Sequence, residues 1–462
     1  MNRLSKSGLF LPSSRIVHGS ARSVVFSRGP AFGSALALCL AGVLTYRNAL
    51  RTPFVWDDKL TIVTNQSIRT LWTWAVLSPP PNTPVAGRPL ANLSFALNYA
   101  LGGLDVAGYH ALNLVIHLVA AALLFGIVRR TVRVHHGQEQ ASDLVSSFVA
   151  LIAAAAWMVH PLVSEVVDYV TQRTESLMGL FCLATLYGAI RAAESQHAVG
   201  WARFAIAACA CGMLTKESMV VAPVLVAMYD RTFLYPSVRE AVRRRGVLYV
   251  GLAATCVIAA AMVSSAPRLR AASASGVTPW VYAVNQPQVL SRYVRLIFWP
   301  RSLVLDYGPP RPIPVSGIVP EATLVVGLVL ATAIALVRWP RAGFLGAAFL
   351  LTLAPTTSFV PVPAEVGAER RMYLPLAAAA VLVVMVGYRS FIRLSPSRGS
   401  VLGCSLAAGA GAGHAAPGPT VATMGRNTFR EIALLKFVVS DHGCLFRCKV
   451  AFQKESLCQC ES

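Results

Sequence analysis

Long apolar runs recur along almost the whole chain of 462 residues, and they restrict its fold more than any other feature. Eleven runs can be distinguished, over residues 31–50, 110–128, 144–159, 175–192, 200–214, 217–234, 246–265, 317–337, 342–359, 372–388 and 400–413. A helix needs about 20 apolar residues to cross the hydrocarbon core of a bilayer. Only 13% of the residues are charged, against about 25% in soluble domains. These features exclude a soluble globular protein and predict an all-α polytopic membrane protein with about 11 transmembrane helices.

The charged residues predict how such a bundle is oriented. The chain carries 41 Lys and Arg against 20 Asp and Glu, a net charge of +21. In a soluble protein this excess would indicate a nucleic-acid partner, but in a membrane protein arginines hold cytoplasmic loops inside. With the N-terminus inside, the arginine clusters fall on the inner face and half of the acids fall on five outer loops. We therefore expect a lipid bilayer and no nucleic acid as partner, and a functional site on the non-cytoplasmic loops.

Composition divides the chain into three parts. Residues 1–30 are basic and contain no acid, which predicts a cytoplasmic tail. Residues 31–414 form the predicted transmembrane core, and within it 286–300 contains two arginines, which predicts an interfacial or re-entrant helix. The outer loops of this core are expected at 51–109, 160–175 and 266–316. Residues 415–462, a low-complexity and then cysteine-containing tail, are expected outside.

Two adjacent carboxylates, Asp57 and Asp58, stand in the first outer loop directly after Trp56. In an extended turn they point to different sides, so one can be hydrogen-bonded in place while the other faces a substrate. A carboxylate near the membrane surface suits a general base acting on a hydroxyl, or a ligand of a divalent metal, the one cofactor that this pattern suggests. Capping of a helix is the structural alternative. Further along the loop, Arg88 suits either a phosphate or an anchor to lipid headgroups.

The second outer loop has the highest density of polar residues. From Glu165 onward it is predicted to form one short helix, on which Glu165, Asp168 and Gln172 share a face. Arg173 is expected either to pair with Asp168 or to bind a phosphate. His160, which precedes a proline, is either a proton carrier or metal ligand, or a cap of the helix that follows.

Two further groups have both a structural and a functional interpretation. His110, Asn113 and His117 share one face of a predicted span, so they form either interhelical hydrogen bonds or part of a site. Lys216 and Glu217, at the turn 214–217, form either a surface ion pair of little energy or a phosphate site at membrane depth.

Two arginines stand on the acidic side, against the positive-inside rule. They are Arg370 and Arg371, and glutamates occur close by at Glu365 and Glu369. The glutamates can neutralise them, or the arginines can clamp a lipid-linked phosphate. We favour the clamp, because the run enters a predicted span directly.

As a set and in this order, these motifs resemble the transmembrane O-mannosyltransferases that carry tetratricopeptide repeats, and their bacterial relatives. The similar segments are Phe54-Val55-Trp56-Asp57-Asp58, Gly87-Arg88-Pro89-Leu90, 97–103, Gly108-Tyr109-His110, His160-Pro161, Gln172-Arg173-Thr174-Glu175-Ser176, 214–217, Leu305-Asp306-Tyr307-Gly308 and 368–375. The resemblance implies a bundle of the GT-C type. Such enzymes move a sugar with inversion from a polyprenyl-phosphate donor to an acceptor hydroxyl, here a protein Ser or Thr.

The same resemblance implies roles for individual residues. Asp57 and Asp58 stand where the family has its catalytic carboxylates, with one of them the base for the acceptor. Basic residues would hold the lipid phosphate. The candidate substrate-binding residues are Arg88, His160, Glu165, Asp168, Arg173, Glu175, Lys216, Glu217, Glu369, Arg370 and Arg371.

The C-terminal tail departs from that family. No 34-residue period of helix pairs is visible, so the tail suggests a truncated or frame-shifted gene product. A transporter or flippase of a lipid-linked substrate is the first alternative function, but it should place ionisable residues near mid-membrane. A non-catalytic membrane scaffold is the second. The Ala- and Arg-rich composition favours a bacterial inner membrane, with the endoplasmic reticulum membrane as the eukaryotic equivalent.

Overall fold

The computed structural model describes residues 28–136, 140–265, 277–357 and 365–394, all within one compact unit of the chain, residues 1–407. Within these ranges the regular structure is helical, without a strand, which confirms the all-α prediction. The predicted run 400–413 and the predicted tail 415–462 lie outside the described residues, as do residues 1–27 of the tail predicted at 1–30.

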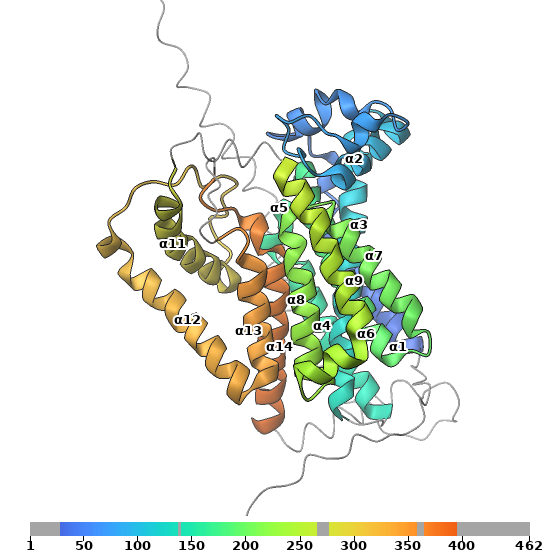
Figure 1. The fold of residues 1–462 in the computed structure, drawn as a ribbon, viewed down its shortest axis with the longest axis vertical. Helices are drawn as coiled ribbons and strands as arrows, with labels where there is room; N and C mark the ends of the chain where they lie inside the picture. Colours follow the sequence, from blue (N-terminus) through green and yellow to red (C-terminus); the bar gives the residue numbers. More distant parts are fainter. Residues whose placement is uncertain (1–27, 137–139, 266–276, 358–364, 395–462) are drawn as a thin grey trace, which may run out of the picture. The chain divides into compact units, whose positions relative to one another are not determined.

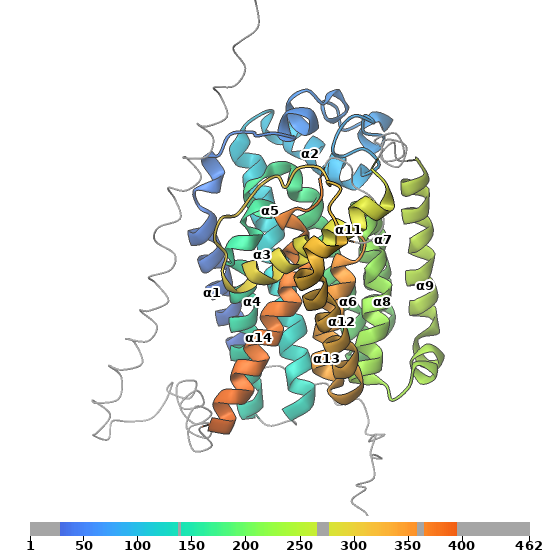
Figure 2. The ribbon, with the colours of Figure 1, turned by 90° about the vertical axis from the view of Figure 1, so that its left-hand side faces the viewer.

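The long helices pack side by side as a bundle, which Figures 1 and 2 show from two directions. They are α1 (Arg28–Tyr46), α3 (Val106–His136), α4 (Gln140–Met158), α6 (Arg173–Glu194), α7 (Ala198–Met213), α8 (Val221–Tyr229), α9 (Val238–Ser265), α12 (Val319–Arg338), α13 (Pro340–Leu353) and α14 (Tyr373–Leu394). Helix α3 packs against α4 and α6, and α7 packs against α6 and α9. Helix α14 contacts both α4 and α13, so it joins the last three helices to the first ones.

Within the described residues, fewer helices meet the length and hydropathy needed to cross a membrane than the eleven predicted. Among the described residues, five segments are long and apolar enough to cross a membrane: Val106–Arg133, Val170–Glu194, Val238–Met262, Val315–Arg338 and Glu369–Leu394. A sixth candidate, Asp143–Met158 with Pro161–Asp168, is bent by 56°. The helices at Ala31–Tyr46, Ala198–Met213 and Pro340–Leu353 are apolar but shorter. Ten of the eleven runs are helical, but the predicted count of about eleven transmembrane helices is not confirmed.

The predicted first outer loop folds into a small cap over one end of the bundle (Figures 1 and 2). Its elements are η1 (Ala49–Arg51), η2 (Lys59–Val63), η3 (Gln66–Ile68), η4 (Trp74–Leu77) and α2 (Pro89–Gly102). The cap has its own apolar core, in which Ile62, Val85 and Phe95 are fully buried. We call the end of the bundle that residues 47–105 cover the capped end, and the other the opposite end.

Six short elements and one longer helix, α11, complete the capped end. They are η5 (Pro161–Val163), α5 (Ser164–Asp168), η6 (Val170–Gln172), η7 (Glu217–Val220), α11 (Pro279–Phe298), η9 (Val315–Ile318) and η10 (Glu369–Met372). The stretch predicted at 286–300 is part of α11, which begins earlier and lies across the direction of α7 and α8 (Figure 2). Tyr282 and Tyr293 are buried on one face of α11, and Arg295 is exposed on another.

The polar stripe of α3 makes interhelical hydrogen bonds. His117 lies 2.9 Å from the Tyr373 hydroxyl through Nδ1 and 3.0 Å from the Met158 carbonyl through Nε2. Asn113 accepts a hydrogen bond of 2.7 Å from Arg173. A buried polar group is costly without such partners. The structural interpretation of this stripe is therefore confirmed.

At the opposite end, three acidic side chains pair with arginines. Arg129 binds Asp143 at 2.9 Å, and Arg130 binds Glu194 at 2.5 Å. In η8 (Asp230–Leu234), the fully buried Asp230 pairs with Arg245 of α9. A buried carboxylate without a partner would be strongly destabilising, so these pairs fasten neighbouring helices.

Candidate functional site

Asp57 and Asp58 lie on a tight turn of the cap, and their carboxylates have different surroundings. The Asp58 side chain is 1% exposed. Its Oδ1 accepts hydrogen bonds from the backbone N–H and the hydroxyl of Thr171, at 2.7 and 2.6 Å. Its Oδ2 accepts one from the backbone N–H of Val55 at 3.0 Å. Asp58 therefore fixes the turn to η6, directly before α6.

The Asp57 carboxylate is half-buried, and within the described ranges it makes no hydrogen bond or ion pair. Only its backbone is held, since its N–H donates to the Tyr169 hydroxyl at 2.9 Å. The two carboxylates thus point to different sides, one bound in place and one available. Burial raises the pKa of Asp58, and the hydrogen bonds from Thr171 and Val55 oppose that rise.

Backbone strain accompanies this turn. Trp56 has φ +45°, a left-handed conformation that is uncommon for a bulky residue. Its indole is 59% exposed, so no tight packing of the side chain explains the conformation. Strain of this kind gathers at functional sites, where it is part of the positioning of reactive groups.

Arg370 links three segments of the capped end. Its Nη1 lies 2.9 Å from Glu165 Oε1, and its Nη2 lies 2.5 Å from Glu365 Oε2. Its backbone N–H also donates to Glu165 at 3.0 Å. The predicted neutralisation by Glu365 therefore occurs, but the second carboxylate comes from α5.

Glu369 and Arg371 turn to other partners. Glu369 is 3% exposed and accepts hydrogen bonds from the Val304 N–H at 2.7 Å and the Tyr307 hydroxyl at 3.2 Å. The structural alternative, in which Glu365 and Glu369 both neutralise the two arginines, therefore holds for Glu365 but not for Glu369. Arg371 donates to the Tyr282 hydroxyl at 3.1 Å and the Thr356 carbonyl at 2.9 Å, and lies 3.5 Å from Glu365. These bonds fasten α11 and the 304–307 loop to η10, directly before α14.

Lys216 and Glu217 do not pair with each other. Lys216 is buried and forms an ion pair with Glu175 of α6. Glu217 instead accepts two hydrogen bonds from Arg88, at 3.0 and 3.2 Å. Burial lowers the pKa of Lys216, and Glu175 counteracts that shift. The two pairs lie close together, because Arg88 and Glu217 both act electrostatically on Lys216.

The Arg88 pair is the more accessible of the two. The Glu217 side chain is 47% exposed, and that of Arg88 is 10% exposed. Arg88 Nε is buried and, among the described residues, has no hydrogen-bond partner. Gly87, which precedes Arg88, has φ +70°, in the left-handed region that favours glycine. This corner turns the chain into α2, so that Arg88 faces the turn at 214–217.

Arg173 does not meet the expectation of a phosphate ligand. It is fully buried, and its guanidinium donates to Asn113 and Asn98 at 2.7 Å each and to the Tyr109 carbonyl at 2.8 Å. It lies 4.4 Å above the Phe95 ring. It does not pair with Asp168. Arg173 instead holds α2, α3 and α6 together beneath the cap.

The second outer loop is not one helix. Helix α5 ends at Asp168, Tyr169 is extended at φ −101° and ψ 109°, and η6 follows. The break separates Asp168 from Gln172, so their predicted common face is wrong. Asp168 Oδ1 is buried and, in the described part, without a hydrogen-bond partner.

His160 has the structural role that was one of its two interpretations. Its Nδ1 accepts the Leu162 N–H at 3.1 Å and caps η5, and its Nε2 lies 3.0 Å from the Ile297 carbonyl of α11. Both ring nitrogens therefore have protein partners.

The structure thus brings together four segments that are far apart in sequence, around Asp57, Glu165, Lys216 and Arg370, at the capped end. The ion pairs and hydrogen bonds that join them cannot be deduced from the spacing of the motifs. Thr171 and Tyr169, which hold the two aspartates, were not among the predicted residues. Their signal was only their position beside Arg173 in the second outer loop. Within the part of the chain that the structure describes, no group of three or more His, Cys, Asp and Glu is arranged to hold a metal ion.

Comparison with known proteins gives relatives of one kind. The chain is 30% identical over 202 residues to "Protein O-mannosyl-transferase tmtc2" of Xenopus laevis and 31% identical over 202 residues to "Protein O-mannosyl-transferase TMTC2" of Mus musculus. It is 28% identical over 225 residues to "Protein O-mannosyl-transferase TMTC4" of Mus musculus. These alignments cover 41%, 41% and 44% of this chain, but only 23%, 23% and 30% of the relatives.

The chain therefore spans about a quarter of the length of the curated TMTC2 relatives that it matches. No family model matches the chain, and no solved structure matches it. The names of the relatives nevertheless confirm the resemblance that the motifs predicted.

Proposed function

We propose, from this homology and from the turn at Asp57 and Asp58, that the chain is a membrane glycosyltransferase of the GT-C type. It transfers a mannose-like sugar, with inversion, from a polyprenyl-phosphate donor to a Ser or Thr hydroxyl of a protein. The capped end carries the site and faces the non-cytoplasmic side. The observation that carries the proposal is the available carboxylate of Asp57 next to the tightly held one of Asp58.

Asp57 is the general base in this proposal. It takes the proton of the acceptor hydroxyl while the hydroxyl oxygen attacks the anomeric carbon. The bond from that carbon to the phosphate oxygen breaks, and the polyprenyl phosphate leaves with its electron pair. Asp58 is a positioning residue, because its three hydrogen bonds hold the turn that presents Asp57. General-base catalysis of this kind contributes about 10²–10⁴-fold to a rate.

Arg88 and Lys216 hold the donor phosphate in this proposal. Both are basic and lie close together, and Arg88 keeps one buried N–H donor without a protein acceptor among the described residues. Glu217, which is half-exposed, can leave Arg88 when a phosphate arrives. Guanidinium groups suit phosphate oxygens. Glu175, Glu165 and Arg370 then keep the surrounding charges paired.

The test is transfer of labelled sugar from a panel of polyprenyl-phosphate sugars to peptide acceptors, with membranes that contain the full chain. Asp57→Asn should lower the turnover by about 100-fold or more with the chain still folded. Asp105→Asn is the matched control, since Asp105 is an exposed carboxylate of the same loop that only accepts a local hydrogen bond from the Ala107 N–H.

Wild-type activity with unchanged activity of Asp57→Asn would overturn the role of Asp57. No turnover with any donor, in a folded and inserted chain, would overturn the proposed function. The transporter and scaffold alternatives are less favoured, because the relatives carry transferase names.

A further inference from the structure

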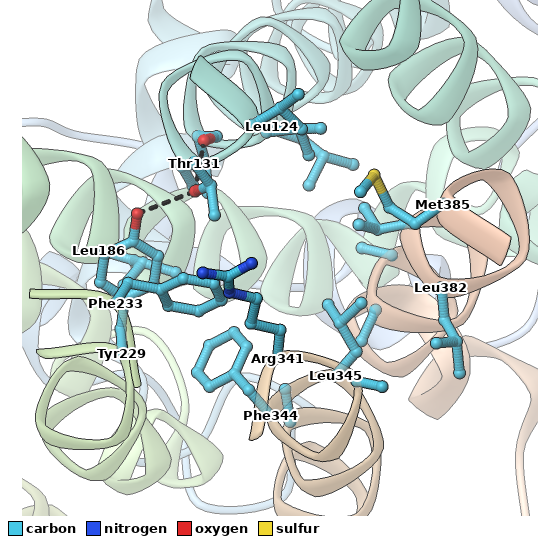
Figure 3. A pocket seen from close by; sticks show the side chains of 18 of the residues that line it. Leu124, Thr131, Leu186, Tyr229, Phe233, Arg341, Phe344, Leu345, Leu382 and Met385 are labelled. Atoms are coloured by element: carbon cyan, nitrogen blue, oxygen red, sulfur yellow. Dashed lines mark hydrogen bonds between the residues drawn. The ribbon is translucent and has the colours of Figure 1, made fainter. Parts of the chain in front are cut away.

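An apolar cavity of about 450 Å³ lies inside the bundle, between α3, α6, α8, α13 and α14 (Figure 3). Its volume is within the range of about 300–1,000 Å³ that small-molecule sites occupy. The walls are mainly aliphatic and aromatic side chains, among them Leu124, Leu186, Phe344 and Leu382. None of the candidate site residues lines it, so this cavity is separate from the site at the capped end.

One face of α14 forms a continuous wall of the cavity. The lining residues of this helix run from Leu374 through Val381 and Met385 to Arg393. At about 1.5 Å per residue this wall is about 28 Å long, close to the thickness of a hydrocarbon core, about 30 Å. An elongated apolar slot of this direction suits a hydrocarbon chain that lies parallel to the helices.

Arginines stand where the slot reaches the opposite end. Arg341, Arg389 and Arg393 all line the cavity. Figure 3 shows the Arg341 side chain reaching into the cavity toward Thr131. Arg341 and Arg389 lie close enough to repel each other. A cluster of like charges at an apolar mouth favours an anion between them.

Some of the other arginines at the same end have carboxylate partners. Arg129, Arg130 and Arg245 each pair with a carboxylate. Within the described ranges, no ion pair or hydrogen bond joins Arg341, Arg389 or Arg393 to another residue.

We propose that this cavity binds one anionic phospholipid, with an acyl chain in the slot and the phosphate between Arg341 and Arg389. The inference goes beyond the proposed function and does not depend on it. The segment 395–462 is a poor alternative occupant, because it contains seven Lys and Arg against four Asp and Glu and would add positive charge to the cluster. A zwitterionic lipid such as phosphatidylcholine fills the slot equally well, but its choline cation offsets the charge of its phosphate beside the arginines.

The test is native mass spectrometry of the purified, delipidated full chain, titrated with dioleoyl-phosphatidylglycerol or with dioleoyl-phosphatidylcholine. Two arginines near a lipid phosphate should favour the anionic lipid by about thirtyfold in affinity. The double substitution Arg341→Gln/Arg389→Gln should remove this preference. The matched control, Arg231→Gln/Arg338→Gln, removes two exposed charges that do not line the cavity, and should keep it.

A second variant tests the slot without changing charge. Ala378→Phe places a ring in the cavity and should lower the binding of both lipids. Equal affinity of the wild type for the two lipids would overturn the proposal, as would full lipid binding by Ala378→Phe. Displacement of the phosphatidylglycerol by undecaprenyl phosphate, or by inorganic phosphate alone, would also overturn it, since the occupant would then be an isoprenoid or a free anion.

Discussion

Replacement of Asp58 by Asn should loosen the turn that presents Asp57, and the hydrogen bonds give the size of the effect. An Asn side chain can keep its oxygen toward the Thr171 N–H and hydroxyl, but its NH₂ group then faces the Val55 N–H, which loses its acceptor. A hydrogen bond to a charged group contributes about 1.5–3 kcal/mol. Relief of the buried charge offsets part of this loss. We expect the opening free energy of the turn to fall by about 2 kcal/mol.

Hydrogen exchange of the full chain measures this opening directly. A loss of about 2 kcal/mol corresponds to roughly thirtyfold faster exchange at the Val55 and Thr171 amides. Asp57→Asn is the matched control, because no hydrogen bond of its carboxylate occurs among the described contacts and its effect should stay within about 0.5 kcal/mol. Unchanged exchange at both amides in Asp58→Asn would refute the assignment of Asp58 as the residue that holds the turn.

Three other outcomes are expected. Burial raises the pKa of Asp58 above its usual value of about 4. Just above that pH the folded state therefore binds more protons than the unfolded state, and the free energy of unfolding should fall as pH rises through this window. Denaturation at several pH values should show this slope in the wild type and a smaller slope in Asp58→Asn. Lys216→Met leaves Glu175 buried without its ion-pair partner and should lower the free energy of unfolding by about 3–5 kcal/mol. Thermal unfolding of the double variant Lys216→Met/Glu175→Leu should show that much of this loss is recovered. An equal loss in both variants would contradict the pairing. Trp56→Gly removes the strain at φ +45° and should raise the free energy of unfolding by about 1 kcal/mol, measured by chemical denaturation. A fall in this free energy would mean that the exposed indole has a packing role.

Much of the fold follows from local features of the sequence. Hydropathy and helix length are properties of short segments, so the predicted apolar runs coincide with helices of the structure, from α1 to α14. The split of Asp57 and Asp58 to two sides also follows locally, because adjacent residues in a turn diverge. The helix predicted from Glu165 is interrupted at Tyr169. The backbone there is extended, and the Tyr169 hydroxyl accepts a hydrogen bond from the Asp57 N–H. That contact joins residues 112 positions apart, and no local pattern contains it.

The choice of partner for each long charged side chain was decided only by tertiary structure. The sequence determined that Lys216, Glu217, Arg173 and Arg370 would be near one end of a helical membrane protein. It did not determine that Lys216 would pair with Glu175, or that Arg173 would donate its hydrogen bonds to neutral groups of α2 and α3. Ion pairs and hydrogen bonds form at about 3 Å, and the packing of helices far apart in sequence decides which groups come within that distance. The cavity along α14 has the same origin, since its walls come from five helices that only the packed bundle brings together.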